Sequence, residues 1–241
     1  MISDTSNCNR YSIMGRKRSS IKKKRRYDAS GRRAQAARSR SAILDAAERL
    51  LLAQGYAEST IASIAAAAKV SVETVYKAFG GKPGLVRAVR DRGLAGTGPI
   101  PAEQRSDRMR VTEHDPRKII ANWGTLVMEV APRVSPILLL VRAAAASDPE
   151  MATLLAEMDA DRLRRMTTNA HHLHQAGHLR HDLTLTDATD ILWTYSSAEL
   201  FELLVLRRGW ALDRYGHFVA DAMVAALLPS KHKHSRKRSK P

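Results

Sequence analysis

Apolar residues recur at helical spacing over residues 36–54, the first patterned stretch of the chain. The apolar positions lie three or four residues apart: Ile43, Leu44, Ala47, Leu50 and Leu51. This spacing places the apolar side chains on one face of an α-helix. Gly55 follows where a helix C-terminus is expected, because glycine adopts the left-handed backbone conformation without strain. The pattern therefore predicts a helix that ends at Gly55.

Two short helices with a tight turn between them are predicted next. Thr60 and Ser71 would begin them, because a hydroxyl at the N-cap accepts a hydrogen bond from the helix backbone. The apolar faces are Ile61, Ile64, Ala65 and Ala68 on the first helix, and Val75, Ala78 and Phe79 on the second. The remaining boundaries are a turn at Lys69-Val70, a stop at Gly80-Gly81 and a new helix near Pro83.

This pair of helices has the pattern of a bihelical DNA reader. Such a reader needs a first helix that packs, a tight turn, and a second helix whose exposed N-terminal half can enter the major groove. If Val75 and Phe79 point inward, the opposite side of their helix is free. The side chains on that side are Val72, Glu73, Thr74, Tyr76 and Lys77. We predict that this edge reads DNA.

Helical periodicity resumes after residue 115. Helices are predicted over 117–131, 136–146, 149–175, about 187–207 and 211–228, with stops at Gly177 and Pro229. No segment alternates with period two for long, so strands are not expected. The predicted fold class is all-α.

The pattern divides the chain into five segments. Residues 1–35 and 229–241 are basic and aperiodic and are predicted to be disordered tails, and residues 93–115 are predicted to be a connector of low order. Between them lie a three-helix helix-turn-helix domain at 36–92 and a helical domain at 116–228.

The positive charge of the chain is concentrated in the two tails. The formal net charge is +16, and residues 1–40 contribute 13 Lys or Arg against 2 acidic residues. Residues 229–241 contribute 6 Lys or Arg and no acidic residue, so residues 41–228 are close to neutral at −1. Such tails bind polyanions without reading sequence, or serve only as solubilising ends, and both interpretations stay open.

Other features of the composition exclude several classes of protein. Cys8 is the only cysteine, so no intrachain disulfide can form, which fits a reducing cytoplasm. There is no uninterrupted apolar run of about 18 residues for a membrane span, and no apolar stretch follows the basic N-terminus as in a secretory signal. We expect a cytoplasmic protein with no membrane partner.

The segment from residue 38 to residue 92 resembles the TetR (tetracycline-repressor-type) family of bacterial regulators. The matching parts are Ala42-Ile43-Leu44-Asp45-Ala46-Ala47, Gly55-Tyr56, Thr60-Ile61, Val70-Ser71, Thr74-Val75-Tyr76, Phe79 and Lys82. Glu73 departs from the Lys or Ser common in that stretch, and Lys77-Ala78 departs from a more usual aromatic-His pair. These departures concern the operator sequence that the domain would recognise and do not affect the resemblance itself.

The resemblance implies DNA-contact roles for named side chains. Thr60, Ser71, Tyr76 and Lys82 would contact phosphate, the first two from helix N-termini. Lys77 and Thr74 are candidates for base edges, and Glu73 either accepts from cytosine N4 or favours its own helix N-terminus. Val72 belongs to the same edge. For each, a solvated helix face or cap is the simpler alternative.

An arginine-rich arm precedes the first patterned helix. Its arginines are Arg32, Arg33, Arg38 and Arg40. The arm would either enter an adjacent minor groove, where arginine is favoured in narrow A·T tracts, or tether phosphates without specificity. We favour the second interpretation and predict that Arg38 contacts DNA.

The resemblance also implies that the C-terminal domain dimerises and binds an effector. The last two helices would pair across a two-fold axis through Leu192, Tyr195, Leu200, Leu203, Leu204, Phe218, Val219, Met223 and Leu227, and two readers would then fit a palindromic operator. A small apolar effector is expected among the helices from 117–131 to about 187–207, with the candidate walls Trp123, Val127, Met128, Leu139, Met158, Met166 and Trp193. Packing within one subunit is the alternative for both sets.

Metal binding and catalysis find little support in the sequence. His171, His174 and His178 recur at helical spacing, but with no nearby cysteine and an interrupting glycine, solvated histidines are expected rather than a metal site. No phosphate loop, nucleophile elbow or catalytic set is present, so neither an enzyme nor a cofactor is expected. The primary hypothesis is a ligand-responsive homodimeric repressor that binds double-stranded DNA, and the alternative is a nucleoid-type protein that binds DNA through its tails.

Overall fold

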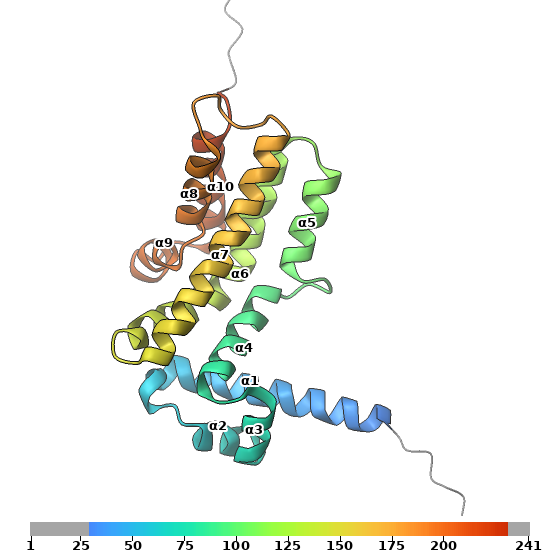
Figure 1. Ribbon diagram of the computed structural model, residues 1–241, viewed down its shortest axis with the longest axis vertical. Coiled ribbons are helices and arrows are strands. Elements are labelled where there is room, and N and C mark those ends of the chain that lie inside the picture. The colour runs from blue at the N-terminus through green and yellow to red at the C-terminus, as the bar shows by residue number, and fades with distance from the viewer. Residues whose placement is uncertain (1–28, 231–241) are drawn as a thin grey trace, which may run out of the picture.

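The computed structural model describes residues 29–230, and every regular element in that range is helical (Figure 1). This confirms the all-α prediction. The chain forms an N-terminal domain of four helices and a C-terminal domain of longer helices. Most of the tails predicted at 1–35 and 229–241 lies outside the described residues, whereas the four arginines of the predicted arm lie within them.

The N-terminal domain consists of α1 (Ala29–Glu58), α2 (Ile61–Ala68), α3 (Val72–Phe79) and α4 (Lys82–Ala95). The regular turns of α1 end at Gly55, whose φ of 82° lies in the left-handed region, as its sequence position predicted. The first seven residues of α1 were predicted to be disordered, and that prediction was wrong. The helix begins at Ala29 because residues 29–38 contain no proline and several alanines and arginines, which are strong helix formers.

Side-chain caps fix the two short helices of the N-terminal domain. The Thr60 hydroxyl accepts from the backbone N–H of Ser63 at 3.0 Å, and the Ser63 hydroxyl accepts from the N–H of Thr60 at 3.2 Å. The Ser71 hydroxyl accepts from the N–H of Thr74 at 3.1 Å. Helices of only eight residues are marginal by themselves, so caps and packing decide that they form.

The C-terminal domain is built on long helices. Its elements are α5 (Ala102–Thr112), α6 (Pro116–Ala145), α7 (Pro149–Gln175), α8 (Leu185–Tyr195), α9 (Ala198–Phe201), the π-helical turn η1 (Glu202–Arg207) and α10 (Leu212–Leu227). Figure 1 shows α6, α7, α8 and α10 side by side, with α5 flanking them. Helix α7 ends at Gln175 and α10 near Pro229, as predicted.

Helix α5 corrects the prediction that residues 93–115 form a connector of low order. Ala102 and Ser106 are buried against the domain. Arg105 donates to the Glu129 carboxylate on α6 at 2.7 Å, and the Thr97 backbone N–H donates to it as well. The Arg105 guanidinium is the main reason that the pKa of Glu129 falls to about 2. These tertiary contacts order a segment whose local sequence is rich in glycine and proline.

Two other boundaries in the C-terminal domain differ from the prediction. The segments 117–131 and 136–146 form the single helix α6, which continues through Pro132 and Pro136. An internal proline costs about 3 kcal/mol, and burial of the apolar side chains around these two offsets it. The helix predicted to span about 187–207 is instead broken at Ser196–Ser197, where the Ser197 hydroxyl caps α9. Helix α8 has Thr184 as its N-cap.

Helices α6 and α10 cross closely at a pair of glycines. A Cβ placed on Gly124 would lie 2.7 Å from the backbone oxygen of Gly216. A Cβ on Gly216 would collide with the side chain of Met128. Any side chain at these two positions would therefore force the helices apart.

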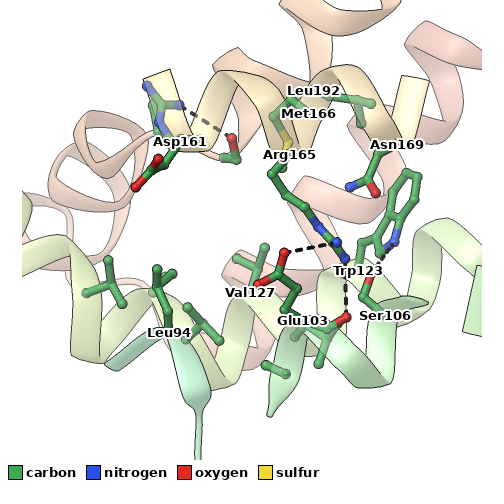
Figure 2. A pocket seen from close by; sticks show the side chains of 18 of the residues that line it. Leu94, Glu103, Ser106, Trp123, Val127, Asp161, Arg165, Met166, Asn169 and Leu192 are labelled. Atoms are coloured by element: carbon green, nitrogen blue, oxygen red, sulfur yellow. Dashed lines mark hydrogen bonds and ion pairs between the residues drawn. The ribbon is translucent and has the colours of Figure 1, made fainter. Parts of the chain in front are cut away.

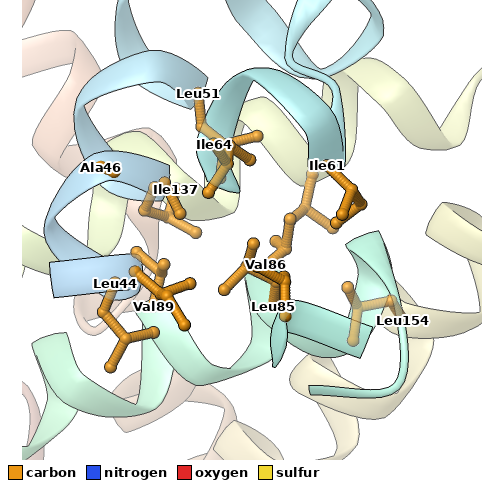
Figure 3. Close-up of a cluster of buried hydrophobic side chains, with 14 of the residues drawn as sticks. Leu44, Ala46, Leu51, Ile61, Ile64, Leu85, Val86, Val89, Ile137 and Leu154 are labelled. Atoms are coloured by element: carbon orange, nitrogen blue, oxygen red, sulfur yellow. The ribbon is translucent and has the colours of Figure 1, made fainter. Parts of the chain in front are cut away.

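The apolar core that holds the reader helices also includes residues of the C-terminal domain. Residues from α1, α2, α3 and α4 pack with Ile137 and Val141 of α6 and with Met151, Leu154 and Met158 of α7 (Figure 3). A second core lies between α6, α7, α8 and α10. The first core joins the two domains mechanically, since interiors this densely packed transmit displacement.

Within the described residues, one helix is long and apolar enough to cross a membrane by length and composition. It is α6, which contacts α1, α4, α5, α7, α9 and α10. Those contacts give it the position of the central helix of a packed domain.

Candidate functional site

Helix α3 presents the predicted reading edge to solvent. Val75 is fully buried, whereas Val72 is 42% exposed and Tyr76 is 52% exposed. Glu73 and Lys77 are also exposed. The structure therefore brings the five predicted side chains together on one short helix, with Thr74 half-buried at its start. Ala78, which was predicted to face inward, is exposed instead.

The two capping hydroxyls are occupied by their own helices. Thr60 and Ser71 are both exposed, and each accepts from a backbone N–H one turn later. The Ser71 and Thr74 hydroxyls also share a hydrogen bond of 2.8 Å. Capping leaves the other first-turn N–H groups of α2 and α3 directed outward, and these groups are suited to phosphate.

The ammonium group of Lys82 lies against the end of α1, whereas a phosphate contact would need it to extend into solvent. Its ammonium nitrogen is 3.9 Å from the centre of the Tyr56 ring and 3.4 Å from the Ala57 carbonyl oxygen. Burial lowers the pKa of Lys82, although Asp148 and Glu58 oppose that effect. In this arrangement Lys82 holds the start of α4 against the end of α1.

The arginine-rich arm is the outer part of α1, which projects past α2 and α3 in Figure 1. Arg38 is exposed and donates to the Gln35 side chain at 2.6 Å. Arg40 turns inward, with its guanidinium 4.5 Å from the centre of the Phe79 ring and 3.4 Å from the Ala78 carbonyl oxygen. Arg40 thus fastens α1 to the end of α3, while Arg33 and Arg38 stay on the projecting helix.

Arginines on α4 connect it to both sides of the molecule. Arg92 pairs with Asp45 and Glu48 on α1. Arg87 pairs with Glu157 on α7, and Arg90 lies 3.3 Å from Asp161 on the same helix. Helix α4 is therefore tied to α1 at one face and to α7 of the C-terminal domain at the other.

A cavity of about 700 Å³ opens between α4, α5, α6, α7, α8 and α10. Four of the predicted effector residues line it: Trp123, Val127, Met158 and Met166. Figure 2 shows Trp123 and Asn169 at one end and Asp161 and Leu94 at the other. Its size and largely apolar wall are those of a small-molecule site.

Three predicted effector residues lie outside this cavity. Met128 packs toward Gly216 at the α6–α10 crossing. Leu139 borders a small separate recess beside α7 and α9. Trp193 lies under the Arg162 guanidinium, 4.2 Å from its ring centre. Helical periodicity alone could not distinguish the cavity-facing side from these neighbouring sides.

The N-terminal domain also matches a known family. The family described as bacterial regulatory proteins, tetR family, matches residues 43–89, which run from the buried face of α1 to α4. Residues 43–89 therefore form a domain of the tetR family. The uncharacterized HTH-type transcriptional regulator YvkB of Bacillus subtilis (strain 168) is 36% identical over 87 residues, which are 36% of this chain and 42% of YvkB.

Solved structures of regulators share the fold over most of this chain. The SmeT–triclosan complex matches with a TM-score of 0.62 and 22% identity over 80% of this chain and 93% of SmeT, which is the repressor of the Stenotrophomonas maltophilia multidrug efflux pump SmeDEF. Native NalD, the secondary repressor of the MexAB-OprM multidrug efflux pump in Pseudomonas aeruginosa, matches with 0.64 and 20% identity over 82% of this chain and 99% of NalD. These neighbours are transcriptional regulators rather than enzymes.

The predicted dimer face of this chain is only partly exposed. Leu192, Val219, Met223 and Leu227 are buried within the subunit, so their predicted place in a dimer contact is corrected. The exposed apolar side chains of this region are Leu203, Leu206, Leu212 and Phe218.

The histidines do not converge. His171 and His174 are exposed near the end of α7, and burial lowers the pKa of His172 between them. Among residues 29–230, no three His, Cys, Asp or Glu side chains gather closely enough to hold a metal ion.

Sequence reasoning missed several cavity residues. Arg90, Asp161, Arg165 and Asn169 all line the cavity. Asn169 had a readable signal, because it falls in register with Met158, Met166 and Leu173 on the apolar face of the predicted helix 149–175. A polar side chain on such a face needs a hydrogen-bond partner within the protein or a functional role that explains its burial.

Proposed function

We propose that this protein is a homodimeric, ligand-responsive repressor that binds a palindromic DNA operator in the cytoplasm. The observation that carries the proposal is the α3 edge, where Val72, Tyr76 and Lys77 are exposed while Val75 anchors the helix. A short capped helix held in this way can enter a major groove without unfolding. The exposed leucines near the C-terminus support pairing of two subunits, which would place two such edges on one duplex.

The continuous core between the domains supports control by a ligand. Met158 belongs to the first core and also lines the cavity. Arg90 links α4 to Asp161 in the cavity wall. A molecule that fits the cavity better in one position of α4 than in another would shift the balance between them and change the spacing of the reading edges.

The structural neighbours support the direction of control. NalD and SmeT are repressors of efflux pumps, and SmeT forms a complex with triclosan. By analogy, an apolar molecule in the cavity would release the DNA and allow transcription.

The test is selection of bound DNA from a random pool with the full chain, followed by titration of the selected duplex with excess competitor DNA. We expect a palindromic sequence that survives competition. Lys77→Ala should weaken binding to the selected duplex by about tenfold or more, because a base contact contributes roughly 1–3 kcal/mol.

Lys118→Ala is the matched control, since Lys118 is an exposed lysine on α6, far from α3. It should leave binding unchanged. Recovery of no common sequence, with binding that depends only on salt, would support the nucleoid-type alternative acting through the basic tails.

A further inference from the structure

Helix α5 forms part of the cavity wall but buries little apolar surface. Among its eleven residues only Ala102 and Ser106 are buried, and Val111 is 78% exposed. Segments without regular helix flank α5 at 96–101 and 113–115. An element with so few buried apolar contacts separates from its domain at a low cost in free energy, so polar contacts decide whether α5 stays in place.

The side of α5 that faces α6 is held by shielded polar contacts. Arg105 donates to both carboxylate oxygens of Glu129 at 2.7 Å, and the backbone N–H of Thr97 donates to the same carboxylate. The Glu129 side chain is only 19% exposed. The indole N–H of Trp123 on α6 also donates to the Ser106 hydroxyl at 3.2 Å. These contacts fix α5 to α6.

The side of α5 that faces α7 depends on a single arginine. Arg165 of α7 donates to the Asp107 carboxylate at 2.7 Å, to the Glu103 carboxylate at 3.2 Å and to the Glu103 backbone carbonyl at 3.3 Å. Figure 2 shows Arg165 reaching from α7 toward Glu103. Within residues 29–230, every hydrogen bond and ion pair that joins α5 to α7 comes from Arg165.

These ion pairs lie where the cavity meets solvent. Arg165 and Glu103 both line the cavity, and the side chains of Glu103 and Asp107 are 69% and 44% exposed. Trp123 and Leu192 of the same wall are buried. Ion pairs this exposed are weak and are screened by salt. The α7 side of α5 should therefore open more easily than the α6 side.

We propose that α5 is a flap over the cavity, that Arg165 with Glu103 and Asp107 forms its latch, and that an apolar molecule enters by parting α5 from α7. The proposal rests on the proposed function in that the cavity is the effector site. The latch closes the empty and the occupied cavity alike. It therefore sets how fast a molecule enters and leaves rather than how tightly it binds.

Stopped-flow kinetics with N-phenyl-1-naphthylamine tests the latch on the full chain. This probe is apolar and uncharged, and its emission can be excited through tryptophan because Trp123 lies in the wall. The double variant Glu103→Gln/Asp107→Asn keeps the shape of both side chains and removes their charge. We expect its association and dissociation rates to rise roughly threefold or more, with the Kd unchanged within about twofold.

The matched control is Asp45→Asn/Glu48→Gln. These two carboxylates pair with one arginine, Arg92, as Glu103 and Asp107 pair with Arg165, but none of the three lines the cavity. Both rates should stay as in the unaltered chain. Equal acceleration in the control would mean that loss of any such pair loosens the molecule, and the latch would be refuted.

Salt supplies a test that needs no folded variant. Raising the ionic strength from about 0.05 M to 1 M screens the latch but not the uncharged probe, so both rates of the unaltered chain should rise. The rates of Glu103→Gln/Asp107→Asn should depend on salt much less. An equal salt dependence in the two chains would contradict the proposal.

Two further results would overturn the inference: unchanged rates in the double variant, or no binding of the probe up to its solubility. Titration of the selected operator in parallel separates the inference from the proposed function. If the operator is bound specifically while the latch has no effect on the rates, the function stands and the flap does not. If the latch controls the rates in a chain that has no DNA sequence preference, the flap stands and the function does not.

Discussion

The two domains of this protein satisfy their polar groups in different ways. In the N-terminal domain, hydroxyl caps, a fully buried Val75 and ion pairs to α4 leave no buried side-chain nitrogen or oxygen without a partner among its described residues. In the C-terminal domain, such unpartnered atoms belong to Arg110, Asn122, Arg133, Asn169 and Trp193, and a cavity of about 700 Å³ opens between its helices and α4. The N-terminal domain therefore satisfies the polar groups of its interior, whereas the C-terminal domain combines unfilled space with unmet hydrogen bonds.

Truncation of one leucine in each domain should give the largest difference in stability between the two domains. Leu85→Ala removes a fully buried side chain from the first core and should lower the free energy of unfolding by roughly 2–5 kcal/mol. Leu126→Ala in the cavity wall should cost clearly less, because that side chain already faces space and has fewer atoms in contact. Urea unfolding of both variants measures the difference, and equal costs would mean that the cavity is closed in solution.

The α6–α10 crossing is the place where the C-terminal domain is tightly packed. Gly124→Ala should lower the free energy of unfolding by about 1–3 kcal/mol, because the added methyl meets the Gly216 backbone oxygen. Helix propensity alone would give the opposite sign, a gain of about 1 kcal/mol. The sign of the change in thermal unfolding temperature therefore decides whether the close approach exists.

One tyrosine in each domain should ionise at a higher pH than a free tyrosine, and the causes differ between the two. The pKa of Tyr56 is raised to about 12 by burial first and then by Asp148 and Glu150, while burial alone raises the pKa of Tyr215 to about 12. A phenol whose pKa is higher in the folded state stabilises that state below the unfolded pKa near 10, and this contribution is lost as the pH rises toward 12.

Absorbance titration at alkaline pH checks this. Asp148→Asn should lower the pKa of Tyr56 and leave that of Tyr215 in place. A shift of both tyrosines would show instead that the variant loosens the whole molecule.

A substitution in the turn between α2 and α3 should give the smallest change in the free energy of unfolding. Lys69 is the only residue other than glycine with a positive φ, 55°, among the described residues. Lys69→Gly should raise the free energy of unfolding by at most about 1 kcal/mol, since glycine adopts this conformation without strain. Lys69→Ala is the control for loss of the side chain and should not stabilise. Equal stability of the two variants in urea would argue against a left-handed turn.

The same contrast explains what the sequence could predict. The caps at Thr60 and Ser71, the stop at Gly55 and the exposed edge of α3 follow from local chemistry within a few residues, and the structure has them where the pattern indicates. Regular helix through Pro132 and order in α5 depend on partners distant in the chain, such as Glu129 for Arg105. No local signal contains that information.

The cavity shows the same limit. Periodicity indicated which faces of α6 and α7 are apolar, and four of seven predicted wall residues line the space. Whether an apolar side chain faces a cavity or a neighbouring helix depends on how closely the helices approach, and a pair of glycines decided that for Met128. The role of Arg40 in packing on Phe79 was likewise invisible without the fold.

Helix α3 packs on α2 and α4, and the cavity wall draws on α4 but on neither α2 nor α3. Mutations in most of that wall can therefore accumulate without touching the exposed edge of α3. Under the proposed function, descendants of this chain could come to sense a different compound while still controlling the same genes. The separation lets evolution change the signal and keep the response.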